Sequence, residues 1–143
     1  MRYDWNEGVE AVEGTMEFFE EIDKRFFGAL KSVMPWKSIP FDNLIPFDEL
    51  NNMHVLEIGV GIGSHAAILS KYAKEYIGID ITSYAVTMTR LRLDLLNQNS
   101  KVLQMDAEKI NLPDSSIDFV WSWGVIHHTS NTFNVLKEIK RIF

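Results

Sequence analysis

The chain has 143 residues, of which 46% are hydrophobic and 24% are charged, proportions that are typical of a single globular domain. Its formal net charge is −6 and its lysines and arginines form no cluster, so nucleic acid is not expected as a partner. The absence of cysteine excludes disulfides and thiolate metal sites. There is no run that predicts a membrane segment or a signal-peptide core, and we expect a cytoplasmic protein.

Residues 3–34 are expected to form one or two amphipathic helices. Apolar residues follow helical spacing with a lapse at Asp23, and Gly8 and Gly14 weaken the first half. These apolar positions are Val9, Val12, Met16, Phe19, Phe26, Leu30 and Val33. Two interpretations stay open: a helix packed on a sheet, or a mobile lid with Tyr3 and Trp5 facing a ligand.

Prolines at positions 35, 40 and 46 break the helical pattern and predict an extended connection. We therefore predict a helical extension and linker over residues 1–48, followed by a second unit over residues 49–143.

In this second unit the pattern alternates between strand and helix. Strands are predicted at 53–58, 76–79, 102–105 and 117–121. Helices are predicted over 64–73, after a cap at Thr82 or Ser83, and from Ser130 or Asn131. The stripes expected to be buried on the last two helices are Tyr84, Met88, Leu91 and Leu95, then Val135, Ile139 and Ile142. Such alternation predicts the α/β class, with a parallel sheet covered by helices on both faces.

Several signals fall at the carboxyl ends of the predicted strands. A glycine-rich turn follows the first strand, Asp80 and Asp106 follow the second and third, and the segment after Trp121 follows the fourth. Because ligands of parallel α/β sheets bind beyond this edge, we expect the ligand site there.

The residue types at this edge favour one kind of ligand. Asp80 lies 21 residues after Gly59, a distance that suits a carboxylate accepting from the two hydroxyls of a ribose. Counted from Gly59, a dinucleotide fingerprint would need glycine where Ser64 stands; counted from Gly61, the position is Ala66, which some fingerprints allow, but the glycines would then lie further into the turn. The Glu57 carboxylate also suits an ammonium group better than a pyrophosphate. S-adenosylmethionine carries a ribose and an ammonium group without phosphate. A nicotinamide-dependent oxidoreductase is the disfavoured alternative.

The ordered motifs resemble those of class I S-adenosylmethionine-dependent methyltransferases of the type 11 small-molecule branch. The glycine turn EIGVGIG at 57–63 is similar to their motif I, and GIDI at 78–81 is similar to their motif II. The segments QMDAE at 104–108 and LPDSSID at 112–118 resemble their adenine-binding segment and fourth strand, and SWGVIHHT at 122–129 resembles the following loop. The resemblance implies a Rossmann-like sheet and runs from about residue 53 to 143.

The resemblance also implies roles for individual residues. The methionine moiety would be held by Glu57 and the backbone of Gly59, Val60 and Gly61, and closed by the backbone of Trp123. The ribose would be bound by Asp80. Adenine would pack on Ile81, with Asp106 accepting from its amino group and the Ala107 N–H donating to its ring.

No catalytic residue and no metal site are predicted. His127 and His128 could supply a base, but the alternative is that both are structural loop residues bonded to the backbone. As metal ligands they are poor candidates, because adjacent side chains are expected to diverge and no third ligand has recognisable spacing. Of Trp121 and Trp123, at least one is expected in the core, and the other could form an acceptor wall.

Family members usually continue through a Lys-Pro-Gly-Gly turn into three more strands, so the resemblance implies a truncated sheet with only the first four of seven strands. We expect methyl transfer to a small-molecule acceptor, with activity uncertain in this chain. The alternative is a non-catalytic cofactor-binding or interaction module. An unpaired edge on the fourth strand also predicts a homo-oligomer formed through that side.

Overall fold

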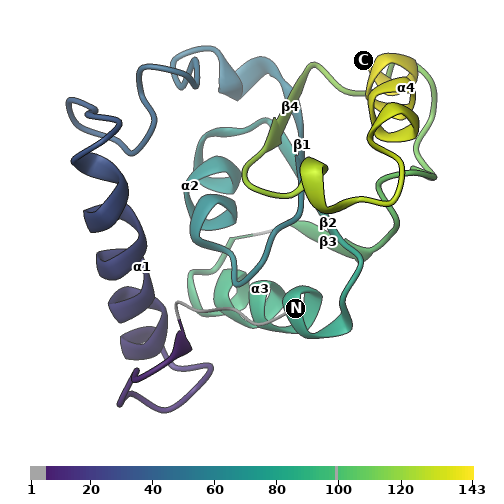
Figure 1. Cartoon of the computed structure of the whole chain (residues 1–143). Coiled ribbons are helices and arrows are strands. Elements are labelled where there is room, and N and C mark those ends of the chain that lie inside the picture. Colours follow the sequence, from purple (N-terminus) through teal and green to yellow (C-terminus); the bar gives the residue numbers. More distant parts are fainter. Residues whose placement is uncertain (1–5, 99) are drawn as a thin grey trace.

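The computed structural model describes residues 6–98 and 100–143 (Figure 1), so Tyr3 and Trp5 lie outside the described residues. Four parallel strands form one sheet in the order β3-β2-β1-β4. They are β1 (His54–Ile58), β2 (Glu75–Asp80), β3 (Lys101–Gln104) and β4 (Phe119–Ser122). The predicted α/β class and Rossmann-like parallel sheet are confirmed, and each strand end lies within two residues of its predicted position.

Helices cover both faces of this sheet. They are α2 (Ser64–Tyr72), α3 (Ser83–Leu95) and α4 (Thr132–Ile142). Val55 packs in a buried cluster with residues of α2 and α3, whereas the next residue, Leu56, packs in a cluster with Val135 and Ile142 of α4. Successive strand residues point to opposite faces, so α2 and α3 lie on one side of the sheet and α4 on the other (Figure 1).

Helix starts follow the predicted capping chemistry. The Thr82 hydroxyl accepts from the Ala85 N–H at the start of α3, and the Asn131 side chain accepts from the Asn134 N–H at the start of α4. These side chains satisfy backbone donors that have no partner within the helix. Both caps lie at predicted positions.

The stripe predicted for α3 is partly wrong. Leu91 and Leu95 are 38% and 44% exposed. The buried positions are Ala85, Val86, Met88, Thr89, Arg92 and Leu93. Because α3 packs against a further helix as well as against the sheet, its buried surface is broader than one apolar stripe and includes two polar residues.

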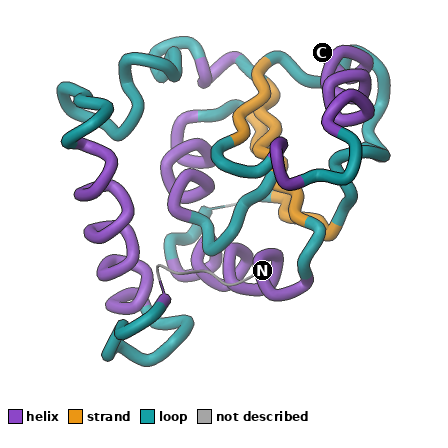
Figure 2. The backbone as a smooth tube through the Cα atoms, in the orientation of Figure 1, coloured by secondary structure: helices purple, strands orange, loops and turns teal. Residues whose placement is uncertain are grey.

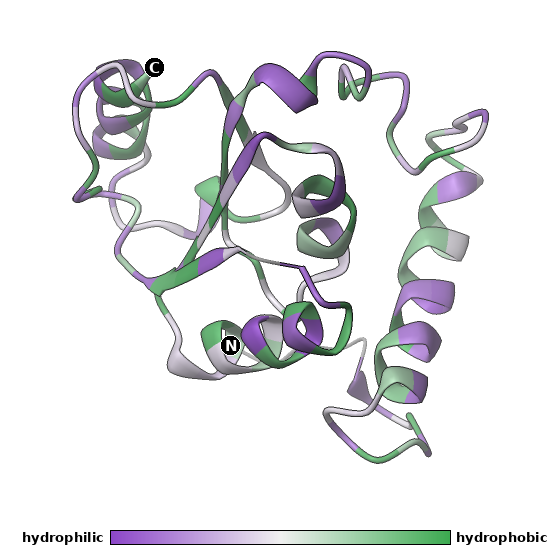
Figure 3. Cartoon of the chain, turned by 180° about the vertical axis from the view of Figure 1, so that it is seen from behind, coloured by the Kyte–Doolittle hydropathy of each residue, from purple (hydrophilic) through white to green (hydrophobic). Residues whose placement is uncertain are grey.

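That further helix is α1 (Met16–Lys31), so the expectation of one or two helices resolves to a single helix that begins after Gly14. The backbone of Gly14 has a φ of 85°, which a helix does not allow, and the Thr15 hydroxyl accepts from the Phe18 N–H as the cap. Val12 and Val33, expected on the buried stripe, are 73% and 72% exposed. In Figure 3 the ribbon of α1 carries both hydrophobic and hydrophilic colours, as an amphipathic helix does.

Helix α1 packs on α2, α3 and the glycine turn, and forms an outer layer beyond α2 (Figure 1). Phe18, Phe19 and Ile22 join one buried cluster with Ile62 of the turn and Met88 of α3. The expected packing on the sheet is therefore replaced by packing on helices, directly over the turn that follows β1.

The connection over residues 32–49 runs as a loop from α1 to a short 3₁₀ helix, Leu50–Asn52, which precedes β1 (Figure 2). It is built of turns and is not the extended segment that its prolines suggest. The Asp42 carboxylate accepts from the N–H groups of residues 37–39, and these bonds lower the pKa of Asp42. Phe41 is fully buried in the cluster that contains Trp121, so this connection covers side chains of β4.

Candidate functional site

The carboxyl ends of the four strands meet at one edge of the sheet, since all pairs are parallel. The glycine turn after β1, Asp80 at the end of β2, Asp106 after β3 and Trp123 after β4 therefore lie along the same edge. The Met105 N–H donates to the Asp80 carbonyl at 2.8 Å, which fixes the segment after β3 against the end of β2.

Asp80 is the centre of the polar contacts at this edge. Its Oδ1 accepts from the N–H and the hydroxyl of Thr82, both at 2.9 Å. Its Oδ2 accepts from the Gly61 N–H at 3.2 Å. A carboxylate has about four acceptor positions, so capacity remains for a donor from a ligand. The bonds hold the carboxylate between the glycine turn and the start of α3.

The glycine turn is fixed to β2 through its backbone. The N–H groups of Gly59 and Val60 donate to the Ile79 carbonyl at 2.8 and 3.3 Å. Gly59 and Gly61 have φ values of 82° and 56°, which glycine adopts without cost. A Cβ on Gly59 would meet the side chain of Val125 at 2.2 Å, so at this position glycine is required by internal packing as well as by backbone conformation.

Glu57 lies inside the protein and not on the open edge. It is 1% exposed and its Oε2 accepts from the Tyr76 hydroxyl at 2.5 Å. Burial raises the pKa of Glu57 to about 8, with a further increase from the negative charge of Asp80. A pKa of about 8 means that the carboxyl group is mostly protonated at neutral pH, and its bond to Tyr76 connects the end of β1 to β2.

The predicted adenine-binding residues lie at the edge with different exposures. The Ile81 side chain is 65% exposed beside Asp80, and its carbonyl accepts from the Gln104 amide. Asp106 is exposed and its Oδ1 accepts from the Glu108 N–H at 2.8 Å. The Ala107 side chain is 8% exposed, because it packs in the cluster under α4. An exposed apolar side chain and a carboxylate with a free oxygen thus flank the end of β3.

An aromatic cluster lies beside the fourth strand. Trp121 is buried, as expected for one of the two tryptophans, and the partly exposed Trp123 stacks on it with 6.2 Å between ring centroids. Phe41 lies 4.9 Å from the Trp123 ring. The cluster also includes His65 of α2, whose ring lies 5.6 Å from that of Trp121.

His65 is a residue of this region that sequence reasoning missed. Its Nε2 is buried without a hydrogen-bond partner among the described residues. Burial, together with the charge of Arg92, lowers the pKa of His65 to about 3, so the ring is neutral. Its ring neighbours come from α1, the connection and β4. These segments are far apart in the sequence, so the residues next to His65 in the sequence do not predict this cluster.

His127 and His128 form part of a short 3₁₀ helix, Ile126–His128, and both are exposed. The expectation that their side chains diverge is wrong, because the ring centroids are 4.0 Å apart. Within residues 6–98 and 100–143, no group of three or more possible metal ligands is present. In the same part of the chain no helix is long and apolar enough to span a bilayer.

Comparison with known proteins gives the family. The family model described as a methyltransferase domain, Methyltransf_11, matches residues 56–143. The uncharacterized methyltransferase YcgJ of Bacillus subtilis is 32% identical over 89 residues, which cover 62% of this chain and 35% of YcgJ. A tRNA U34 carboxymethyltransferase of Pseudoalteromonas atlantica is 26% identical over 144 residues, which cover 87% of this chain and 44% of that protein.

Among solved structures, a SAM-dependent methyltransferase from Aquifex aeolicus superposes with a TM-score of 0.63 and 30% identity. The match covers 68% of this chain and 54% of that one. The chain thus spans between about a third and about a half of the length of these relatives. With its parallel sheet, its glycine turn and the family match over more than half of its residues, the chain belongs to the S-adenosylmethionine-dependent methyltransferase family.

Proposed function

We propose that the carboxyl edge of the sheet binds S-adenosylmethionine and that the protein transfers its methyl group to a small-molecule acceptor. The observation that carries the proposal is the arrangement of Asp80, held by Thr82 and Gly61 with acceptor capacity to spare. The exposed Ile81 beside it would contact the adenine, and the free oxygen of Asp106 would accept from the adenine amino group.

The remaining predicted residues would act at the methionine end. The backbone of Gly59, Val60 and Gly61 would line this end, and the Trp123 backbone would close it. Glu57 is 1% exposed and binds Tyr76 through Oε2, so we propose that it acts mainly by supporting the turn from inside the protein. When bound, the cofactor supplies a methyl group on a sulfonium. The protein chiefly has to align the acceptor, an effect that is worth about 7–11 kcal/mol.

Charge at the covering segment favours a small-molecule acceptor. Residues 7–23 contain seven carboxylates and no lysine or arginine. The first half of α1 belongs to this segment and lies over the glycine turn. A phosphate backbone would be repelled there, because proteins bind RNA through positive surface.

One observation favours a second candidate, transfer to RNA. The similarity to the tRNA U34 carboxymethyltransferase covers 87% of the chain, which is more than the family match at 56–143 covers. A non-catalytic cofactor-binding module is the third possibility.

We also propose the division into an extension at 1–48 and a domain at 49–143, a cytoplasmic location, and self-association through β4.

Calorimetry with S-adenosylhomocysteine, and with NAD for comparison, tests the cofactor assignment. We expect S-adenosylhomocysteine to bind and NAD not to bind. The substitution Asp80→Asn should weaken it by about 1.5–3 kcal/mol, because the ribose loses a charged acceptor. Asp94→Asn, at an exposed carboxylate on the far part of α3, is the matched control. Equal affinity of the Asp80 variant and wild type would refute the assignment.

Methyl transfer from labelled cofactor to a panel of small molecules and to tRNA separates the acceptor classes. If label appears in small molecules and not in tRNA, the proposal is supported. Label in tRNA supports the second candidate, and cofactor binding without any product supports the third.

A further inference from the structure

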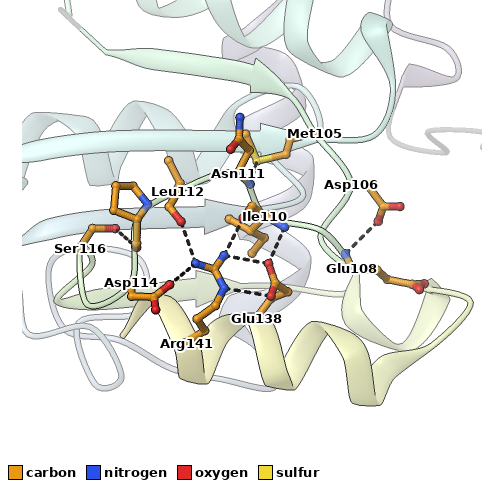
Figure 4. A network of polar contacts seen from close by, with 11 residues as sticks. Met105, Asp106, Glu108, Ile110, Asn111, Leu112, Asp114, Ser116, Glu138 and Arg141 are labelled. Carbon is orange, nitrogen blue, oxygen red and sulfur yellow. Dashed lines mark hydrogen bonds and ion pairs between the residues drawn. The ribbon is translucent and has the colours of Figure 1, made fainter.

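The segment that would face the adenine, residues 105–110, is held by polar contacts, among them a network with side chains of α4 (Figure 4). At its first residue, the Met105 N–H donates to the Asp80 carbonyl. In its middle, Glu108 Oε1 accepts from the Asn131 N–H at 2.8 Å. At its end, both backbone groups of Ile110 are bound by side chains of α4. The turn that begins with Asp106 is therefore fixed at three points.

The third point is the most elaborate. Glu138 Oε2 accepts from the Ile110 N–H at 2.7 Å, and Arg141 Nη2 donates to the Ile110 carbonyl at 2.6 Å. Arg141 also donates to the Leu112 carbonyl at 2.8 Å and to Asp114 Oδ1 at 2.6 Å. One guanidinium thus binds backbone carbonyls on two residues and a carboxylate on a third.

The two side chains also bind each other. Arg141 Nε and Nη2 donate to the two oxygens of Glu138 at 3.0 and 2.9 Å, and this contact lowers the pKa of Glu138. The fork of a guanidinium makes such paired contacts with defined directions, whereas a lysine ammonium does not. The pair therefore sets the orientation of Ile110, which is itself buried in the cluster under α4.

The residues that hold the segment at 105–110 are distant from it in the sequence. Glu138 and Arg141 lie 28 and 31 residues after Ile110 and belong to α4. They reach none of the predicted cofactor-binding side chains directly. Apart from the bonds between the two side chains, the hydrogen bonds of these side chains go to residues 110, 112 and 114.

We propose that Glu138 and Arg141 are positioning residues for base recognition, which hold the Asp106–Ala107 turn in the orientation that selects adenine. This inference rests on the proposed cofactor site. It assigns to α4 a role in the choice of the nucleobase, separate from the binding of the ribose by Asp80.

The test compares the affinities for S-adenosylhomocysteine and for its inosine counterpart, in which the amino group is replaced by a carbonyl. Wild type should prefer adenine, because the inosine compound presents a carbonyl acceptor to the Asp106 carboxylate where adenine presents an amino donor. In Arg141→Lys, we expect affinity for the adenine compound to fall about tenfold while affinity for the inosine compound changes little. Lys140→Met, an exposed neighbour on the same helix, is the control and should keep the full preference.

A second variant tests the same proposal in case Arg141→Lys does not fold. Glu138→Gln keeps a side-chain acceptor for the Ile110 N–H but removes the charge that orients Arg141, and it should lower the preference in the same direction. Amide hydrogen exchange at Ile110 should quicken in both variants. Equal weakening of both ligands, or no change in preference, would overturn the positioning role while leaving the cofactor site intact. A wild type that binds neither compound would remove the proposed function and this inference together.

Discussion

Glu57 shows how one buried carboxyl group before the glycine turn makes the stability of the fold depend on pH. The pKa of Glu57 is raised from 4.5 to about 8, so between these values the folded state keeps a proton that the unfolded state has lost. The free energy of unfolding contributed by this group is fully present below pH 4.5 and is lost as the pH rises through 8. Because Glu57→Gln cannot ionise, we expect the variant to be more stable than wild type at pH 9, and little different at pH 4.5.

Urea unfolding at several pH values measures this difference. Glu75→Gln, at an exposed carboxylate on β2, is the control and should follow wild type at every pH. A Glu57→Gln variant whose stability declines with pH as steeply as that of wild type would show that the buried carboxyl group does not cause the decline.

The positions of Glu57 and His65 mark the limit of what residue patterns predict. The motif EIGVGIG places Glu57 before the turn, but the Tyr76 hydroxyl that binds it belongs to another strand. His65 stands alone in a helix, and its ring neighbours come from α1, the connection and β4. The positions of Asp80 and Asp106 at this edge were predictable, because a residue at the carboxyl end of a parallel strand is placed by topology alone.

At the scale of elements, a partly buried ion pair connects α1 to α3, in addition to the apolar cluster beneath α1. Arg92 of α3 binds Asp23 of α1 through two nitrogens, and its side chain is 5% exposed. Asp23→Ala would leave a buried guanidinium without this partner, so we expect a loss of roughly 2–4 kcal/mol in the free energy of unfolding. Chemical denaturation measures it, and Glu20→Ala, at an exposed carboxylate on the same helix, is the control.

The double variant Asp23→Ala with Arg92→Met distinguishes the ion pair from local helix effects. If the pair causes the loss, removing the stranded charge should restore part of the stability. A single Asp23→Ala variant no less stable than Glu20→Ala would contradict the expectation.

The same ion pair illustrates why the positions of helices and strands were predicted more accurately than the faces that they bury. Strand and helix order follows from local apolar periodicity, and Thr82 and Asn131 cap their helices through bonds within a few residues. The buried surface of α3 depends on α1, which lies about 70 residues away in the sequence and brings Asp23 to Arg92. Leu91 and Leu95 are exposed because the faces chosen by tertiary packing differ from the apolar stripe.

For the whole molecule, the side of the sheet at β4 remains the surface where we expect self-association. Among the described residues β4 pairs only with β1, and α4 exposes Phe133 and Leu136 at 64% and 52%. An unpaired strand beside exposed apolar side chains favours association with another copy. Sedimentation at micromolar concentration should therefore show dimers, and Leu136→Glu should shift them toward monomers.

Leu44→Glu is the matched control, because Leu44 is 51% exposed on the connection between α1 and β1. This substitution should leave the dimer unchanged. A wild-type monomer at all concentrations would indicate that the connection covers β4 sufficiently, and self-association would have to be abandoned.

The strand order also sets the sequence of events in folding. Val55 pairs with Tyr76 on one side and with Phe119 on the other, so the two pairings close loops of 21 and 64 residues. The longer closure costs only about 1 kcal/mol more in chain entropy, but it must be met before β4 gains any contact. We therefore expect native contacts of β2 to form earlier in the folding transition state than those of β4. The φ-value of Ile79→Val should exceed that of Val120→Ala, and the edge that receives the cofactor would then be completed last, from its β4 end.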